Sequence, residues 1–269
     1  MVQLSVVVPA FNEERRLQAA VNGAVAYLAP LQVTFEIIIV DDGSTDATST
    51  VIGTLEQRFS QVRSIRLPVN SGKGAAVKAG MMAAQGAHVL FTDADQSTSI
   101  DQLPRVMSPV VHDGFDIAMG SRALAASRIV VGQKWYRQAL ARGFGAATRI
   151  LFVRGFRDCQ CGFKLFTRDA ARMLFPMITS RTAIFDMELM LLAARKGYRI
   201  AEVPIDWRHD PDSRLTYSFW TSLGLLRELL RMKLHWRVTF APKASVTQCE
   251  SPASLTDAAA IMARTAPIR

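Results

Sequence analysis

The sequence predicts an α/β fold with a doubly wound, mostly parallel central sheet. Over the first 120 residues, short runs of Val, Ile, Leu and Phe alternate with helical patterns, and nearly continuous apolar runs are typical of strands buried on both faces of a parallel sheet. A repeated order of strand and helix predicts ligands at the carboxyl ends of the strands. With 269 residues, of which 49% are apolar, the chain can form one large domain or two small ones.

Five strands are expected in this first part of the chain, and helices separate them. The expected strands span residues 4–8, 34–40, 62–67, 88–92 and 115–119. The acidic residues Glu13 and Glu14 follow Asn12 and indicate the start of the first helix. The segment 44–46 is typical of a cap for the second helix, and Gly86 indicates the end of the third.

The pattern changes after Arg122, where we expect additions to the same sheet rather than a second domain. Residues 133–154 are a basic, aromatic-rich stretch with a helical pattern, and residues 219–236 predict a helix with a wide apolar stripe. Two interpretations of this stripe are open: it packs on the domain, or it lies in a membrane interface. Residues 241–269 are rich in Ala, Ser, Thr and Pro and are expected to form a disordered tail. The other expected elements are a strand at 163–166, a helix at 183–196 and a strand at 198–203.

The net charge of +9 favours a polyanionic partner. Between Arg122 and Arg157 the chain has eight Lys or Arg residues and no Asp or Glu. A solvated helical face normally mixes both signs, so this stretch favours a surface that meets phosphates or lipid headgroups. Aromatic residues interleave with the basic ones, as in nucleic-acid-binding modules. Such a module would leave the paired carboxylates described below unexplained, and we expect no nucleic-acid partner.

The composition and the start of the chain bear on the cellular compartment. No run approaches the roughly 18 to 20 uncharged apolar residues that a membrane-spanning helix requires. The start, Met1 to Pro9, lacks the basic region and cleavage site of a secretory signal. We therefore expect a cytoplasmic protein that is soluble or lies on a membrane. Cys159, Cys161 and Cys249 fit neither a disulfide framework nor a redox or zinc motif, and we interpret them as reduced packing residues.

Polar residues follow the first two expected strands. Asn12 and Glu13 come after the first strand, and Asp41 comes at the end of the second, followed by Gly43. An Asp at the carboxyl end of a strand suits hydrogen bonds from a nucleotide's base or ribose hydroxyls, so the two motifs together favour a nucleotide pocket. Lys73 stands in a Gly-rich segment at the expected start of the third helix. This segment lacks the P-loop spacing, and a phosphate site and an ordinary loop with a cap are both open.

The sharpest motif is Asp93-Ala94-Asp95, at the end of the fourth expected strand. Two carboxylates two residues apart repel one another in a partly dry cleft unless a cation neutralises them. Hard oxygen ligands suit Mg²⁺ or Mn²⁺, which would bridge to a diphosphate and stabilise its charge as it leaves. Taken alone, such a motif is equally typical of a turn. Its place after the fourth strand favours a metal site.

In their order along the chain, these motifs resemble family 2 glycosyltransferases with a GT-A fold. The resemblance covers about residues 3 to 237, and within the family the chain is most similar to the dolichyl-phosphate β-glucosyltransferases. The motifs that many sugar transferases share lie at residues 9–13, 40–44, 70–74, 93–95 and 120–122. Those more specific to the lipid-phosphate branch lie at residues 157–168, 184–189 and 200–207.

The resemblance implies a role for each matching residue. The diphosphate and its metal would be bound at Asp93, Ala94 and Asp95, with Asp93 and Asp95 as metal ligands. Arg122 would meet a phosphate, Arg137 would hold the acceptor phosphate, and Asp186 would orient the sugar or the acceptor, with a structural cap as the alternative for Asp186. The residues expected to line the nucleotide are Pro9, Phe11, Asn12, Glu13, Asp41 and Lys73.

The implied activity is inverting transfer of a hexose, with glucose from UDP-glucose expected, to a polyprenyl (dolichyl or undecaprenyl) phosphate. The alternatives are a mannosyltransferase that uses GDP-mannose, and a family 2 transferase to a polysaccharide or another non-lipid acceptor. The basic stretch and the amphipathic helix favour the lipid phosphate and a peripheral site on the inner, cytoplasmic face of the membrane. The implied domain spans 1–238, with a nucleotide-binding half at 1–120, an acceptor half at 121–210 and a membrane-facing helix at 218–237.

Two positions depart from the relatives. Related lipid-phosphate mannosyltransferases often have a Gln metal ligand two residues after the second Asp, where this chain has Ser97. The remaining coordination of the metal is therefore open. The membrane helix that precedes the catalytic domain in eukaryotic glucosyl relatives is also missing from the sequence, so membrane attachment is expected from the basic stretch and the helix at 219–236.

Overall fold

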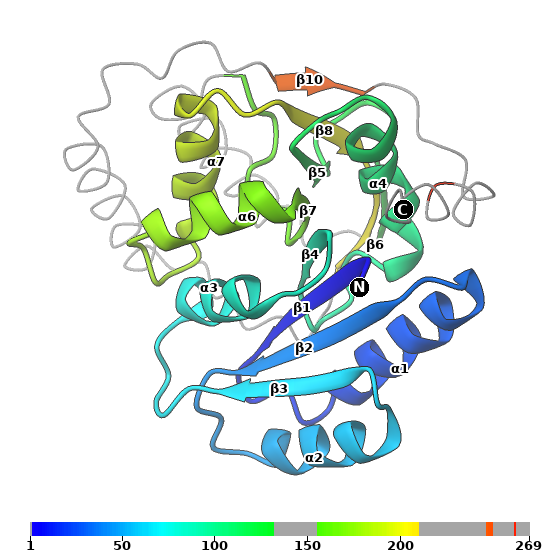
Figure 1. Cartoon of the computed structure of the whole chain (residues 1–269), viewed down its shortest axis with the longest axis vertical. Coiled ribbons are helices and arrows are strands. Elements are labelled where there is room, and N and C mark those ends of the chain that lie inside the picture. The colour runs from blue at the N-terminus through cyan, green and yellow to red at the C-terminus, as the bar shows by residue number, and fades with distance from the viewer. Residues whose placement is uncertain (1, 132–154, 210–245, 250–260, 262–269) are drawn as a thin grey trace.

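The computed structural model describes residues 2–131, 155–209, 246–249 and 261, and these form an α/β fold around one large sheet (Figure 1). Eight strands of the described chain form this sheet in the order β10-β8-β5-β7-β4-β1-β2-β3, and β6 and β9 pair separately. Their bounds are β1 Leu4–Ala10, β2 Phe35–Asp41, β3 Val62–Arg66, β4 His88–Thr92, β5 Ile117–Ser121, β6 Arg128–Val131, β7 Phe163–Thr167, β8 Ile200–Pro204, β9 Asp206–Arg208 and β10 Val246–Gln248.

The predicted parallel sheet is confirmed, with one exception. β1, β2, β3 and β4 pair in parallel, as do β5, β8 and β10. β7 is antiparallel to both of its neighbours, β4 and β5. About 40 residues of sequence separate β5 from β7, which is long enough for β7 to enter the sheet in either direction.

Helices cover both faces of the sheet. The apolar side chains of each strand alternate between the faces: Val7 and Phe91 pack with one group of helices, and Leu4 and Leu90 with the other. Figure 1 shows α3, α6 and α7 on one side and α1 and α4 on the other, and α2 packs on the same side as α1. The bounds are α1 Leu17–Leu28, α2 Thr48–Arg58, α3 Lys73–Ala83, α4 Leu103–His112, α6 Arg168–Leu174 and α7 Phe185–Arg195, with 3₁₀ turns at Ala29–Leu31, Ile100–Gln102 and Phe175–Met177.

Two expectations about element boundaries are wrong. The first helix begins at Leu17, four residues after Glu13, because Asn12 adopts a left-handed backbone with φ 56° and the chain turns before it becomes helical. Within the expected tail, Val246–Gln248 pairs with β8 as the edge strand β10, and Ile261 is buried. Helix α4 lies between the fourth and fifth expected strands, where a helix was expected, whereas α6 was not expected. The expected helices at 133–154 and 219–236 lie outside the described residues.

The strand order locates the place where a ligand can enter. β1 lies between β2 and β4, and the chain leaves it toward β2 and β3 on one side before it crosses to β4 on the other. In such sheets a crevice opens at the carboxyl ends of the two strands where the order reverses. Across the described part of the chain, none of the helices has the length and apolar character needed to cross a bilayer.

Candidate active site

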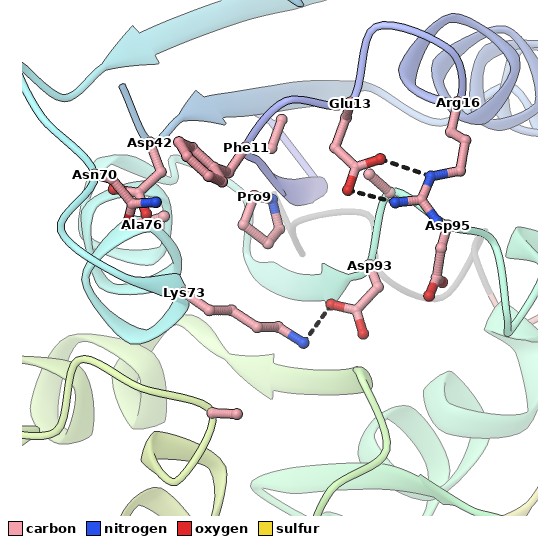
Figure 2. A pocket seen from close by; sticks show the side chains of 13 residues that line it. Pro9, Phe11, Glu13, Arg16, Asp42, Asn70, Lys73, Ala76, Asp93 and Asp95 are labelled. Carbon is pink, nitrogen blue, oxygen red and sulfur yellow. Dashed lines mark hydrogen bonds and ion pairs between the residues drawn. The ribbon is translucent and has the colours of Figure 1, made fainter. Parts of the chain in front are cut away.

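A cavity of about 360 Å³ lies at the carboxyl ends of β1 and β4 (Figure 2). Its position is the one that the strand order predicts, and its volume falls in the range of small-molecule sites. The sequence motifs that end β1 and β4 and begin α3 meet here. The lining residues are Pro9, Ala10, Phe11, Glu13, Arg16, Asp42, Asn70, Lys73, Ala76, Asp93, Ala94, Asp95 and Ala183.

Three charged side chains form the floor of this cavity. Figure 2 shows Lys73 reaching from the first turn of α3 toward Asp93, and its Nζ lies 2.7 Å from Asp93 Oδ1. The pKa of Lys73 is raised, because the charges of Asp93, Asp186 and Asp95 outweigh the effect of burial, which lowers it. Burial and then the charge of Asp93 raise the pKa of Asp95. The cavity therefore holds two carboxylates that repel one another and a cation that compensates one of them.

Ser97 supports Asp95 in this arrangement. Its backbone N–H donates to Asp95 Oδ1 at 2.9 Å, and its hydroxyl also forms a hydrogen bond with that carboxylate. These bonds fix the orientation of the Asp95 carboxylate.

Gly162 makes room for Asp93. The Gly162 carbonyl accepts the Asp93 backbone N–H at 3.2 Å, and a β-carbon at position 162 would overlap the Asp93 carboxylate. Just before β7, the backbone of Gly162 therefore packs directly against Asp93 at the end of β4. A glycine is needed here for close approach, and its φ is not in the left-handed region.

The donor set at the floor of the cavity fits a hard divalent cation. Asp93 and Asp95 offer carboxylate oxygens within one cavity, and a lysine ammonium already lies beside one of them. In the described residues no cluster of three or more His, Cys, Asp or Glu side chains is placed to hold a metal. Mg²⁺ sites built from one or two carboxylates commonly take their remaining ligands from substrate phosphates and water. The pair thus suits a cation that arrives with a phosphorylated ligand.

Asp42, rather than the predicted Asp41, lines the cavity. Asp41 is 1% exposed, and its side chain points toward the start of α2. Its Oδ1 accepts the Ser44 N–H at 2.8 Å, and its Oδ2 accepts the Ser49 hydroxyl at 2.9 Å. Asp42 accepts the N–H groups of Ser71 and Gly72 at 2.7 and 2.8 Å. It therefore holds the loop that leads into α3, which carries Lys73.

Asn12 is also absent from the lining. Its Oδ1 accepts the Thr45 N–H at 2.8 Å, and its own N–H donates to Ser44 Oγ at 2.9 Å. Asn12 thus ties the loop after β1 to the loop after β2. Its neighbour Glu13 does line the cavity and forms two hydrogen bonds of 2.7 Å with Arg16, as Figure 2 shows.

Arg122 lies at the end of β5 and is paired with Asp158. The Arg122 guanidinium donates from Nε to Asp158 Oδ2 at 2.6 Å and from Nη2 to Oδ1 at 2.8 Å. Burial raises the pKa of Asp158, but the charge and hydrogen bonds of Arg122 prevail and hold that pKa at about 2. Arg122 is not among the residues that line the cavity, and its contact with a phosphate stays a prediction.

Asp186 lies in the first turn of α7 and interacts electrostatically with Lys73, but it does not line the cavity. It is 3% exposed, and its Oδ1 accepts a hydrogen bond from Lys164 Nζ at 2.5 Å. Lys164 is fully buried and donates also to the Cys161 carbonyl. Burial raises the pKa of Asp186 against the opposing charges of Lys164 and Lys73. The structure therefore places Asp186 in a buried ion pair, and its contact with a sugar stays a prediction. Arg137 lies outside the described residues.

Several residues that line the cavity were not predicted from the sequence, although the alternation of side chains along β2 could have identified Asp42. Alternation along β2 places positions 38, 40 and 42 on the face of α3, so Asp42 and not Asp41 faces the start of that helix. Asn70 begins the motif at residues 70–74 but was not predicted to line the site, and Arg16 had no signal. Neither did the pairing of Arg122 with Asp158, which joins positions 36 residues apart.

Comparisons with known proteins find similar sequences over most of the chain. The family model described as Glycosyl transferase family 2 matches residues 5–175. A dolichyl-phosphate beta-glucosyltransferase from Mus musculus is 37% identical over 260 residues, which cover 90% of this chain and 80% of that protein. One from Dictyostelium discoideum is 35% identical over 246 residues, which cover 87% and 75%.

Among solved structures, the chain is similar to glucosyl-3-phosphoglycerate synthase from Mycobacterium tuberculosis in complex with Mn²⁺ and uridine-diphosphate-glucose. The TM-score is 0.63 at 22% identity, and the match covers 86% of this chain and 79% of that chain. At this identity the similarity shows the fold, and it agrees with the α/β architecture of the sheet.

Proposed function

The chain belongs to glycosyl transferase family 2, and from this we propose that it moves glucose from UDP-glucose to a polyprenyl phosphate, such as dolichyl or undecaprenyl phosphate. The observation that carries the proposal is the pair Asp93 and Asp95 in the cavity at the end of β4. The names of the relatives supply the sugar and the class of acceptor. The acid-free basic stretch between Arg122 and Arg157 supports an acceptor that carries a phosphate.

The cavity residues divide between the two ends of a nucleotide sugar. Pro9 and Phe11 offer apolar surface to the base, and Glu13 and Asp42 offer acceptors for its polar groups and for the ribose hydroxyls. Asn12 and Asp41 act by holding the loops around this end of the cavity. The charged residues Lys73, Asp93 and Asp95, at the other end of the cavity, suit the diphosphate together with its metal ion.

Asp93 and Asp95 would hold Mg²⁺ or Mn²⁺, which when bound neutralises the negative charge that grows on the departing diphosphate. Lys73 adds a fixed positive charge beside Asp93. Arg122, held in a fixed orientation by Asp158, adds a second. Positive groups that are in place before the reaction stabilise the leaving group without the cost of reorganisation.

The acceptor needs little activation. A phosphate monoester has a second pKa of about 6, so near neutral pH it is largely a dianion and attacks without a general base. Its oxygen forms a bond to the anomeric carbon as the bond from that carbon to the UDP oxygen breaks, and the configuration inverts. We propose that Arg137 holds the acceptor phosphate for this in-line attack.

Strand β6 has exposed apolar side chains that could contact a membrane. Ile129 and Val130 are 50% and 57% exposed, and Arg128 beside them is exposed as well. Apolar side chains next to basic ones suit the interface of an anionic membrane. We propose that this strand and the basic stretch that follows it bring residues 121–210, the acceptor half, to the cytoplasmic face of a membrane.

The test is a transfer assay with the purified protein, Mn²⁺, a short polyprenyl phosphate and labelled UDP-glucose, GDP-mannose or UDP-N-acetylglucosamine in parallel. Label should enter the organic phase from UDP-glucose. Asp95→Asn should reduce the rate at least about a hundredfold, or roughly 3 kcal/mol, whereas Asp113→Asn, at an exposed position far from the cavity, should not. Transfer from GDP-mannose alone would contradict glucose as the transferred sugar. Activity of Asp95→Asn equal to that of the wild type would contradict the proposed metal site.

A further inference from the structure

Glu202 is a buried carboxylate that the proposed reaction does not use. It lies on β8, opposite Met119 of β5 and Gln248 of β10, and it is 0% exposed. Burial raises its pKa, and hydrogen bonds from Ser121 and the backbone oppose that shift. A charge enclosed at this depth costs stability unless its oxygens are well satisfied, so the groups that it binds indicate what it does.

The groups that Glu202 binds belong to one loop and to the end of one strand. The Arg157 N–H donates to both oxygens, at 3.2 and 3.0 Å, and the Asp158 N–H donates to Oε1 at 2.8 Å. The Ser121 hydroxyl, on the last residue of β5, also donates to the carboxylate. Glu202 therefore fixes the first two residues of the loop 157–162 to the sheet.

The same loop reaches both of the strand ends that carry the proposed catalytic groups. At its start, Asp158 holds the Arg122 guanidinium with two hydrogen bonds. At its end, the Gly162 carbonyl accepts the Asp93 N–H, and the missing side chain of Gly162 leaves room for the Asp93 carboxylate. A displacement of this loop would move Arg122 and Asp93 together.

We propose that Glu202 is a positioning residue that sets the distance between the Arg122 guanidinium and the Asp93 carboxylate through the loop 157–162. The proposal rests on the proposed function for its effect on catalysis, and on the contacts above for its effect on the loop. The role needs an ionised carboxylate, because its two oxygens only accept hydrogen bonds and at least three donors converge on them. An amide in its place would turn an N–H₂ group toward backbone N–H groups.

Glu36 provides a matched control. It is also buried, on β2, and its carboxylate accepts the Ser5 hydroxyl at 2.6 Å, the Gln85 N–H at 2.7 Å and Arg63 Nε at 2.8 Å. Its donors lie at the amino end of the sheet, away from the cavity. The two glutamates thus share burial and a set of three donors. They differ in which end of the sheet they hold, and one donor of Glu36 is the charged Arg63.

The experiment compares Glu202→Gln with Glu36→Gln in the full chain by hydrogen–deuterium exchange, by Mn²⁺ binding in the presence of UDP, and by kcat and KM for UDP-glucose. Both variants should lower Tm, because each places an amide among donors that need an acceptor. Glu202→Gln alone should speed exchange at 157–162 at least fivefold, weaken Mn²⁺ binding and lower kcat at least tenfold with little change in KM. If Glu202→Gln does not fold, Glu202→Asp keeps the charge, shortens the reach by one methylene and should show the same changes to a smaller degree.

Unchanged exchange at 157–162 in Glu202→Gln would overturn the proposal, as would faster exchange with kcat and Mn²⁺ binding like those of Glu36→Gln. A wild-type protein that transfers no glucose would overturn the proposed function instead. Exchange and Mn²⁺ binding do not depend on transfer, so they would still decide the role of Glu202.

Discussion

Gly162 contacts the Asp93 carboxylate so closely that no β-carbon fits at position 162. We therefore expect Gly162→Ala to displace Asp93 and to weaken Mn²⁺ binding in the presence of UDP by about tenfold or more, which corresponds to about 1.4 kcal/mol. Isothermal titration with Mn²⁺ at saturating UDP measures this. The control is Gly23→Ala in α1, where nothing lies within 4 Å of the added carbon. It should bind Mn²⁺ like the wild type and be slightly more stable. Normal Mn²⁺ affinity in Gly162→Ala would show that Asp93 is not a ligand.

The pair of Arg122 and Asp158 predicts a dependence of stability on acid. The pKa of Asp158 is about 2 in the folded protein, below its ordinary value near 3.9. Its contribution, about 2 kcal/mol, is therefore complete above the unfolded pKa and is lost as pH falls toward 2. Urea unfolding of the wild type and of Asp158→Asn should differ by this amount at pH 6, and the difference should shrink between pH 4 and pH 2. A difference that stays constant over this range would contradict the ion pair.

The buried pair of Lys164 and Asp186 predicts a non-additive effect on stability. Lys164→Met leaves the Asp186 carboxylate buried without its partner and should lower the free energy of unfolding by about 3–5 kcal/mol. Replacing both residues, as Lys164→Met with Asp186→Leu, should recover most of this loss, since no charge stays buried. Denaturant unfolding of the two single variants and the double variant measures the coupling.

If Asp186 orients the sugar or the acceptor, the double variant should be stable and inactive. Full transfer activity of the double variant would rule out that role.

The two adjacent aspartates at the end of β2 should behave differently. Asp42→Ala removes the acceptor for the Ser71 and Gly72 N–H groups and should weaken UDP binding by about tenfold, or about 1.4 kcal/mol. Asp41→Asn should leave UDP affinity within about twofold and lower stability by about 1–3 kcal/mol, because its partners lie on the side of α2. UDP titration and thermal unfolding of both variants separate the roles. The reverse pattern would restore Asp41 as the nucleotide contact.

The central strands could be predicted from sequence because strands buried on both faces consist mostly of apolar residues. β2 is buried at each of its seven positions, and four of these, Ile37 to Val40, form a continuous apolar run. The direction of β7 could not be predicted, since its apolar residues fit an antiparallel neighbour as well as a parallel one. β10 was missed because Val246–Gln248 is three residues long and owes its place to pairing with β8.

In the candidate site, residues at strand ends could be predicted and their partners could not. Asp93 and Asp95 stand directly after a buried strand, and topology alone brings that end to the cavity. Glu202, by contrast, lies inside a strand where periodicity predicts only burial, and its role depends on a loop 44 and 45 residues away in the chain. Contacts of this kind leave no periodic pattern in a single sequence.

The choice of acceptor is the central claim, and a competition assay tests it most directly. Purified protein, Mn²⁺ and labelled UDP-glucose would be incubated with equal concentrations of dolichyl phosphate and 3-phosphoglycerate, and the label in the organic and aqueous products would be measured. The account predicts that nearly all of the transferred glucose is found in the organic phase, and that Asp95→Asn abolishes this transfer. Glucose transferred mainly to the soluble phosphate would contradict the proposed lipid acceptor.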